Sequence, residues 1–204
     1  MRKLILSLLL PFILLMMPME AHAEQIEDEV MYYMIVDRFN IGDHQFSKQV
    51  RVNDPYAYQG GDLLGITKRL DYLMRFGYTT IILSPIMANA PDGYHGYWIE
   101  DFYRVEEEFG TMDDLHHLIE EAHKRDMKVI LELVTNYISE THPFASDPDK
   151  QHWFKDEVQF ERTPSTTWLD HVKVLDQEEE EVITYLLDVA HYWLSETDID
   201  GYKI

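Results

Sequence analysis

Short apolar stretches alternate with helical patterns along most of this 204-residue chain. β-Branched and aromatic residues mark four strand-like stretches, at 31–36, 79–85, 128–134 and from Gly201 onward. Between them, apolar residues recur at helical spacing at 60–78, after Thr111 and at 182–194. Near-continuous apolar strands that alternate with helices are typical of a parallel sheet covered by helices. The order predicts an α/β fold, a partial (β/α)8 TIM barrel with its first four strands; a complete barrel needs about 250 residues.

Local signals set the bounds of these elements. Gly77 is placed to end the first helix, Pro85 stops the second strand, and Thr111 with Asp114 forms an N-cap pair. The polar stretch after the third strand contains three prolines and has no clean period. We therefore expect an inserted loop or small subdomain at about 138–176.

The first residues have the pattern of a signal peptide. Arg2 and Lys3 precede an apolar run, Leu4–Met17, and Ala21–Ala23 has the small-x-small form of a cleavage site. The pattern predicts cleavage before Glu24, a secreted extracellular protein, and a folded part that spans 24–204. An uncleaved membrane anchor is the alternative, but the run is short for a membrane span and is interrupted by proline.

The formal charge of −21 narrows the choice of partners. Such a surface repels nucleic acid and anionic lipid, and it suits neutral or cationic ligands, although solubility alone would also explain it. The chain has no cysteine. An exported fold without disulfides must be held by its core, with or without a metal ion.

Three stretches together resemble the N-terminal half of the catalytic barrel in the α-amylase family of retaining α-glucan hydrolases. They begin with YYMIVDRFNIGD, with YQGGDLLGITKRLDYLMRFGYTTIILSPI and with GYHGYWIEDFYRVEEEFG, the last continuing to LELVTNY. Their order and spacing extend the resemblance over Val30–Ile204, with a poorly matched gap at about 139–175. The resemblance implies hydrolysis of α-glucosidic bonds in starch-like glucans, with an α-glucan or maltooligosaccharide as ligand, and the signal-peptide pattern adds secretion.

The GYHGYW phrase carries the expected sugar site. It follows the second strand, at the sheet edge where barrel enzymes place their sites. The resemblance implies that His95 bonds the sugar at the cleavage subsite and Tyr97 stacks on it, with Tyr94 and Trp98 beside them. Tyr137 stands where the family has a substrate-contacting histidine. The alternative is a loop filled by aromatic packing.

The resemblance also implies calcium as a cofactor. Asn136 matches a calcium ligand of the family and Asp176 a second ligand of the same ion, although an amide that caps a loop would explain Asn136 equally well. A second calcium loop would use Asp43 and Asp62. Ile41 counts against it because isoleucine cannot coordinate calcium, and Asp62 could instead cap the following helix.

The last residues bear on catalysis. In the family, the nucleophilic aspartate continues this strand, so it would follow Ile204, and Lys203 stands at the position of an arginine that holds it. Glu132 replaces a shorter aspartate. We therefore assign no catalytic residue within the chain and expect a truncated, catalytically incomplete protein, because retaining cleavage needs a pair of carboxylates.

Three alternatives stay open. The chain could be a non-catalytic glucan-binding protein, a half-barrel that is completed by a partner chain, or the front half of a related glucan transferase. Unless a partner chain covers them, the open sheet edges predict self-association, because unpaired strands invite further pairing.

Overall fold

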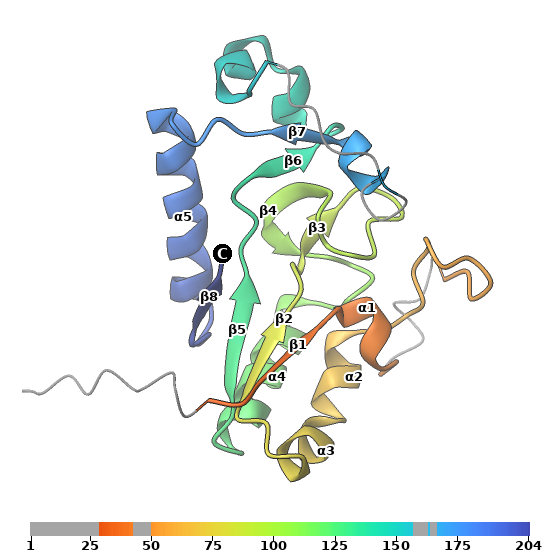
Figure 1. Ribbon diagram of the computed structural model, residues 1–204. Helices are drawn as coiled ribbons and strands as arrows, with labels where there is room; N and C mark the ends of the chain where they lie inside the picture. The colour runs from red at the N-terminus through yellow and green to blue at the C-terminus, as the bar shows by residue number, and fades with distance from the viewer. Residues whose placement is uncertain (1–28, 43–49, 157–162, 164–166) are drawn as a thin grey trace, which may run out of the picture.

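The computed structural model of the protein describes residues 29–42, 50–156, 163 and 167–204 (Figure 1). The predicted signal peptide at 1–23 and Asp43 lie outside the described residues. The central element is a four-stranded parallel sheet in the order β1-β2-β5-β8, which is also the order of the strands along the chain. Its strands are β1 (Met31–Met34), β2 (Thr80–Leu83), β5 (Lys128–Glu132) and β8 (Gly201–Lys203).

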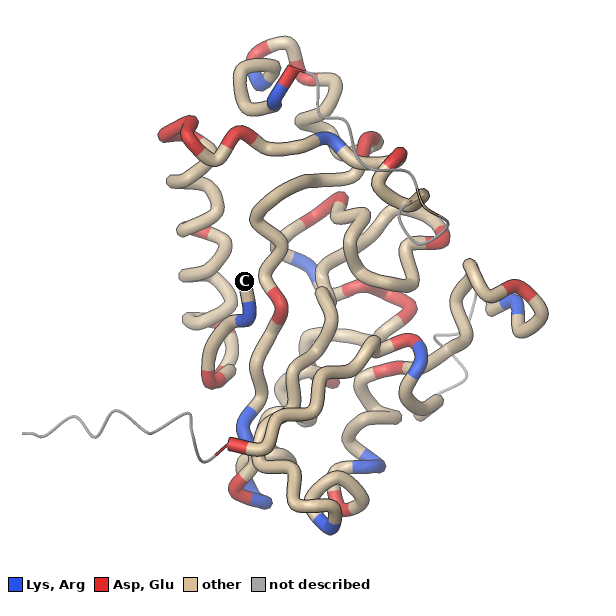
Figure 2. Tube along the Cα trace, viewed as in Figure 1, with Lys and Arg blue, Asp and Glu red and all other residues tan. Residues whose placement is uncertain are grey.

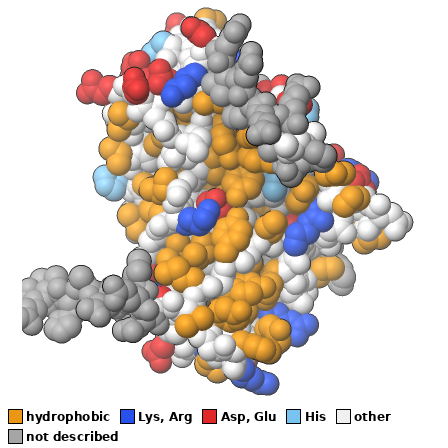
Figure 3. Space-filling model, in the orientation of Figure 1, with side chains coloured by type: hydrophobic (Ala, Val, Ile, Leu, Met, Phe, Trp, Pro, Cys, Tyr) orange, Lys and Arg blue, Asp and Glu red, His pale blue; other side chains and the backbone are white. Residues whose placement is uncertain are grey.

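The two faces of the sheet differ in burial. Side chains alternate between faces along a strand, and one alternate set is fully buried against the helices: Ile81, Leu83, Val129 and Leu131. On the opposite face Met31 is 38% and Tyr33 41% exposed, and hydrophobic side chains gather over the strands on the side turned to the viewer in Figure 3. The sheet is an open arc, and this half-exposed face corresponds to the interior of a barrel wall.

The described part of the first connection, from β1 to β2, contains three short helices. They are α1 (Val36–Phe39), α2 (Leu63–Thr67) and α3 (Leu70–Arg75). The predicted continuous helix at 60–78 is wrong. Arg69 adopts φ −110° and ψ 2°, outside the helical region, so α2 and α3 are separate helices; at this break Arg69 Nε donates to Asn40 Oδ1 at 3.1 Å.

Gly77 ends α3 as predicted. Its φ of +83° is left-handed, its N–H donates to Met74 O, and the N–H of Tyr78 donates to Leu73 O. These two bonds form the Schellman pattern that satisfies the last carbonyls of a helix. Glycine adopts this conformation without the steric penalty of a Cβ.

Helices α4 (Met112–His123) and α5 (Glu180–Glu196) form the other two connections. Thr111 and Asp114 make the predicted capping box at the start of α4. The buried stripe of α4 is Leu115, Leu118, Ile119 and Ala122, and α5 buries Val182, Leu186, Val189 and Trp193. In Figure 1, α4 lies behind the sheet and α5 beside β5 and β8, so the helices cover the outer side of the arc.

Two antiparallel ribbons, absent from the sequence predictions, rise from the carboxyl edge of the sheet. β3 (Met87–Asn89) pairs with β4 (Ile99–Val105) after β2, and β6 (Tyr137–Ser139) pairs with β7 (Val172–Val174) after β5. The described residues between β6 and β7 include the 3-10 helices η2 (Pro143–Ser146), η3 (Pro148–Trp153) and η4 (Thr167–His171).

The predicted strand at 31–36 is too long at its end. The chain leaves the sheet after Met34 because Val36 N donates to Ser84 Oγ at 3.1 Å and Arg38 N to Ile35 O at 3.0 Å, which begins α1. This early turn brings Asp37 and Arg38 to the carboxyl edge.

Charge and hydropathy agree with a folded, acidic domain. Acidic residues lie along many outer loops and at the first turn of α5, as Figure 2 shows. Among the helices of the described residues, we find none that is long and apolar enough to cross a membrane.

Candidate functional site

The predicted sugar-site residues lie in the loop between β3 and β4, at the carboxyl edge of the sheet. Gly96 holds this loop close to the end of β2. Its φ is +87°, and a Cβ on it would lie 2.1 Å from Pro85 O, so only glycine fits. The close approach fixes His95 and Tyr97, on either side of Gly96, over the edge of the sheet.

His95 is the centre of an aromatic cluster. Its ring stacks on Tyr97 at 5.6 Å between centroids and meets Tyr94 at 5.0 Å and Trp98 at 4.8 Å edge-to-face. His95 Nδ1 accepts the N–H of Tyr97 at 3.0 Å. Burial, with a smaller contribution from the charge of Arg38, lowers the pKa of His95 to about 4. The imidazole is therefore neutral at pH 7, with Nδ1 as acceptor and Nε2 carrying the proton.

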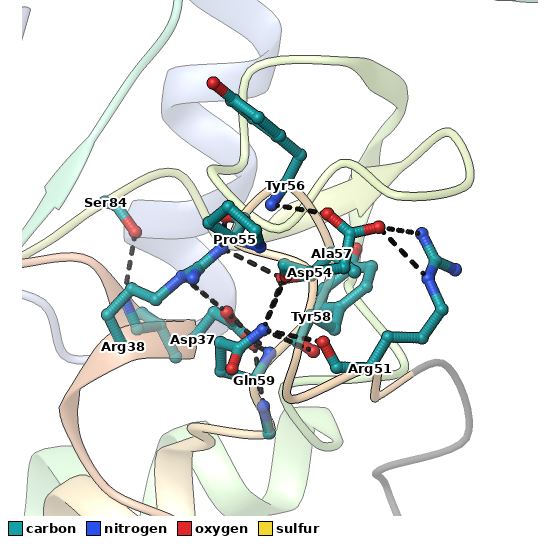
Figure 4. A network of polar contacts seen from close by, with 12 residues as sticks. Asp37, Arg38, Arg51, Asp54, Pro55, Tyr56, Ala57, Tyr58, Gln59 and Ser84 are labelled. Carbon is teal, nitrogen blue, oxygen red and sulfur yellow. Dashed lines mark hydrogen bonds and ion pairs between the residues drawn. The ribbon is translucent and has the colours of Figure 1, made fainter.

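Arg38 holds the loop from the other side. Its guanidinium lies 3.9 Å from the centroid of the Tyr94 ring, a cation–π distance. Its Nη2 donates to Pro55 O at 3.0 Å and to Ala57 O at 2.9 Å, as Figure 4 shows. Sequence reasoning missed Arg38, although a basic residue just after the first strand is a usable signal.

Asp37 forms an ion pair with Arg38 and holds its guanidinium in place. Its Oδ2 lies 2.9 Å from Arg38 Nε, and its carboxylate also accepts the N–H groups of Gln59 and Gly60 (Figure 4). The carboxylate is buried, and this burial raises its pKa in spite of the bonds and the nearby charge. The network joins the end of β1 to the segment 55–60.

Glu132, the last residue of β5, joins three elements. It accepts from Tyr33 Oη of β1 at 2.8 Å, from Tyr97 Oη at 3.2 Å and from Lys203 Nζ of β8 at 2.6 Å. Burial raises the pKa of Tyr33, and its hydrogen bonds with Tyr97 and Glu132 raise it further. Burial also raises the pKa of Tyr97. Both phenols are neutral donors. Tyr33 is a site residue that the sequence reasoning did not single out.

Trp168, on η4, also escaped the sequence reasoning. Its ring stacks on Tyr97 at 5.1 Å and an interplanar angle of 24°, and it contacts Tyr137 edge-to-face at 5.5 Å. The predicted site residue Tyr137 is thereby brought into the cluster. A hollow of about 480 Å³ lies over this cluster; its lining is Ile35, Tyr56, Tyr94, His95, Tyr97, Trp98, Thr167, Trp168 and His171.

The arrangement suits a neutral, ring-shaped ligand. Aromatic faces can pack on the apolar faces of a sugar, and imidazole and phenol groups at their margins can bond its hydroxyls. The volume lies within the usual range of small-molecule sites.

Asn136 and Asp176, the predicted calcium ligands, lie on adjacent segments. Leu175 N donates to Asn136 O at 2.8 Å, so the two backbones are paired. Asn136 Oδ1 accepts from Gln177 Nε2 at 2.7 Å, and Asp176 Oδ1 accepts from Glu178 N at 3.2 Å. Both side chains offer oxygen donors, the kind that calcium prefers, but two such residues fill only part of the about six to eight positions around that ion. Within the described ranges, no group of three or more His, Asp or Glu side chains is arranged to hold a metal.

Asp62, predicted for a second calcium loop, caps a helix. Its Oδ1 accepts from Gly65 N at 2.5 Å and from Gly42 N at 2.9 Å at the start of α2. Its proposed companion, Asp43, lies outside the described residues.

Comparisons with known proteins agree on one family. The description "Alpha amylase, catalytic domain" matches residues 33–204. The chain is 30% identical over 182 residues to α-amylase 2 of Dictyoglomus thermophilum and 39% identical over 124 residues to an α-amylase of Saccharomycopsis fibuligera. These alignments cover 87% and 58% of this chain but only 32% and 25% of the relatives.

Solved structures lead to the same conclusion. An α-amylase of Anoxybacillus is 50% identical with a TM-score of 0.79, over 87% of this chain and 40% of that one. An α-amylase of Geobacillus thermoleovorans, solved in complex with acarbose, is 50% identical with a TM-score of 0.77, over 86% of this chain and 39% of that one. The α-amylase catalytic domain is a TIM barrel, and the open sheet β1-β2-β5-β8 is a part of its wall. This chain belongs to the α-amylase family.

Proposed function

We propose that this protein binds α-glucans at the hollow over His95 and Tyr97 and belongs to a secreted hydrolase of α-glucosidic bonds. The observation that carries the proposal is the neutral His95 within a ring of aromatic side chains at the carboxyl edge of an α-amylase-type sheet. The acarbose complex of the Geobacillus thermoleovorans relative supports a sugar-like ligand. Secretion rests on the predicted signal peptide, and calcium on Asn136 and Asp176.

A second candidate is glucan binding without hydrolysis. It is favoured by the ion pair of Lys203 with Glu132, because lysine lacks the planar two-point grip of arginine on a carboxylate. In this reading the aromatic hollow holds a sugar, and no acid pair within the described residues acts on its linkage. The two candidates share a ligand and differ in turnover.

One experiment separates them. The protein, expressed from its complete reading frame, is titrated with maltotriose and assayed for release of reducing ends from soluble starch. Tyr97→Ala removes a ring of the cluster, and Tyr72→Ala removes an exposed tyrosine on α3 as the matched control. We expect binding that weakens about tenfold in Tyr97→Ala alone, which corresponds to about 1.4 kcal/mol.

Each result decides between the candidates. Release of reducing ends supports the hydrolase, and binding without release supports the glucan-binding protein. Equal affinity in Tyr97→Ala and the wild type would show that the Tyr97 ring takes no part in sugar binding, and the absence of maltotriose binding by the wild type would remove the sugar site from this hollow.

We also propose that the chain associates with itself through its sheet. Within the described ranges, β1 and β8 each pair on one side only, and Met31 and Tyr33 expose apolar surface beside them. Sedimentation velocity should detect oligomers that Met31→Lys reduces, because a charge on an open sheet face opposes pairing. A concentration-independent monomer would contradict this.

A further inference from the structure

The two sides of the hollow are built by segments far apart in the sequence. Ile35, Tyr56 and Tyr94 lie on the lining together with Thr167, Trp168 and His171, which come from η4. His95, Tyr97 and Trp98 connect the two groups through their ring contacts. The segment between β6 and β7 therefore contributes a wall to a site whose other residues come from the first half of the chain.

The rings of Trp168, Tyr97 and His95 form a triangle. The centroid distances are 5.1 Å from Trp168 to Tyr97, 5.5 Å from Trp168 to His95 and 5.6 Å from His95 to Tyr97. Near-equal sides mean that Trp168 and His95 do not lie on opposite faces of Tyr97. Rings at these distances are in contact, so a pyranose has no room between Trp168 and Tyr97.

The hydroxyl of Tyr97 already has hydrogen-bond partners within the protein. Its hydroxyl contacts Glu132 and Tyr33 at 3.2 Å each. The stacked indole of Trp168 covers part of its ring. Tyr97 by itself thus offers a sugar less apolar surface than its place in the cluster suggests, and the larger indole beside it lines the same hollow.

The backbone that carries Trp168 is held in place. Trp98 Nε1 donates to Trp168 O at 2.9 Å, and Glu140 N donates to His171 O at 2.9 Å. His171 Nδ1 lies 2.8 Å from Glu140 Oε1, and its ring meets Trp98 at 5.1 Å. These contacts fix both ends of η4, so the indole is presented in one position before a ligand arrives, which lowers the cost of binding.

From this geometry we propose that Trp168 is a sugar-contacting residue, whose indole provides the principal stacking face for a glucosyl unit of an α-glucan in this hollow. The proposal rests on the function proposed above and assigns to the segment between β6 and β7 a direct part in ligand affinity. Tyr97 supports the indole, and the neutral His95 and Tyr94 lie at the margins of the sugar.

The test uses the protein expressed from its complete reading frame, with maltotriose as the probe. Affinity is measured by calorimetry for the wild type, Trp168→Ala, Trp168→Phe and Phe76→Ala, the last removing an exposed ring at the end of α3. We expect at least a tenfold loss for Trp168→Ala, a smaller loss for Trp168→Phe, and no change for Phe76→Ala. Urea unfolding of each variant reports whether the fold is retained.

The outcomes are distinct. Retained affinity in Trp168→Ala, with wild-type binding intact, overturns this inference and leaves the proposed function standing. Tighter binding in Trp168→Ala would mean that the indole covers the face of Tyr97, which also overturns it. If the wild type itself binds no maltotriose, the proposed function and this inference both fail. If Trp168→Ala fails to fold, Trp168→Phe decides: a loss of affinity supports the proposal and wild-type affinity contradicts it.

Discussion

The ammonium nitrogen of Lys203 lies 2.6 Å from Oε1 of Glu132, and the two residues are direct partners in the register of β8 on β5. The Glu132 side chain is 11% exposed, whereas the Lys203 side chain is 43% exposed. The pair therefore joins a nearly buried acceptor to a cation that still reaches water. Tyr33 and Tyr97 supply the other donors to the same carboxylate.

Removal of the cation should destabilise the protein measurably. Lys203→Met leaves the Glu132 carboxylate with two phenol donors only, and a buried acceptor that loses a charged partner costs about 1 kcal/mol or more. Urea unfolding of the variant should show this loss, and Lys203→Arg should restore most of it. Lys173→Met, on β7, is the exposed-lysine control; an equal loss in that variant would contradict a specific role for the pair.

Acid should weaken the fold through His95. Its pKa is about 4 in the folded protein and 6.5 ordinarily, so between these values the unfolded chain binds a proton that the folded chain does not. The contribution of this group to stability is complete above pH 6.5, falls as the pH drops from 6.5 to 4 and levels off below, with a total loss of about 3 kcal/mol. Urea unfolding at pH 7 and pH 4.5 should show a smaller fall in His95→Gln; identical pH profiles would contradict the assignment.

The affinity for sugar should not change between pH 5 and pH 8. Since His95 stays neutral down to about pH 4, its hydrogen bonds to a ligand do not change between pH 5 and 8. Maltotriose titrations at these two pH values should give equal affinity. A step in affinity near pH 6.5 that disappears in His95→Gln would show that the imidazole titrates normally.

Glu29 should contribute to stability at a lower pH than His95 does, with a loss between pH 4.5 and about 2. Its carboxylate accepts from Lys128 Nζ at 2.7 Å, from Thr80 Oγ1 at 2.6 Å and from Thr79, and the bond to Lys128 is the largest cause that lowers its pKa to about 2. The stabilising contribution is complete above pH 4.5 and is lost as the pH falls through 2. Glu29→Gln should be less stable than the wild type at pH 6, with a gap that narrows by pH 2.5.

A second glutamate provides the control for Glu29. Glu121 on α4 has its pKa lowered to about 2 by Lys124 and Arg125, and its side chain is 23% exposed, against 12% for Glu29. Added salt should therefore reduce the effect of Glu121→Gln more than that of Glu29→Gln. A gap for Glu29→Gln that stays constant from pH 6 to pH 2.5 would contradict the low pKa.

Calcium should raise the melting temperature if Asn136 and Asp176 bind it. A ligand that binds the folded state alone stabilises it by mass action. Calorimetric melting with 5 mM calcium and with a chelator should differ in the wild type by several degrees, and the difference should vanish in Asp176→Asn with Asn136→Ala. Asp62→Asn serves as the control, since Asp62 caps α2. Loss of the calcium response in that variant alone would place the calcium in the second predicted loop, that of Asp43 and Asp62.

The sequence predicted those features that depend on local interactions. Gly77 and the pair of Thr111 with Asp114 end and begin helices through contacts between residues at most five apart, so their chemistry can be read directly from the chain. The four parallel strands and their order were also predictable, because apolar runs that alternate with helices allow few topologies.

The rest depends on contacts between distant residues. Arg69, at the break between α2 and α3, donates a hydrogen bond to Asn40. Glu132 accepts a hydrogen bond from Tyr33, which lies 99 residues away in the sequence. Trp168 reaches Tyr97 from a segment with no periodic pattern. In the candidate site, Tyr94, His95, Tyr97 and Trp98 were found through one phrase, while Arg38, Tyr33 and Trp168 needed the fold.

The strand order β1-β2-β5-β8 has a consequence for how the protein forms during synthesis. Within this four-stranded sheet, each strand that leaves the ribosome finds the previous one already made and exposed as a template, and none of the four has to insert between two others. Translation delivers about 5–20 residues per second, slower than the pairing of short segments. The nascent polypeptide can therefore add one strand at a time to the growing sheet, in the order in which the strands are translated.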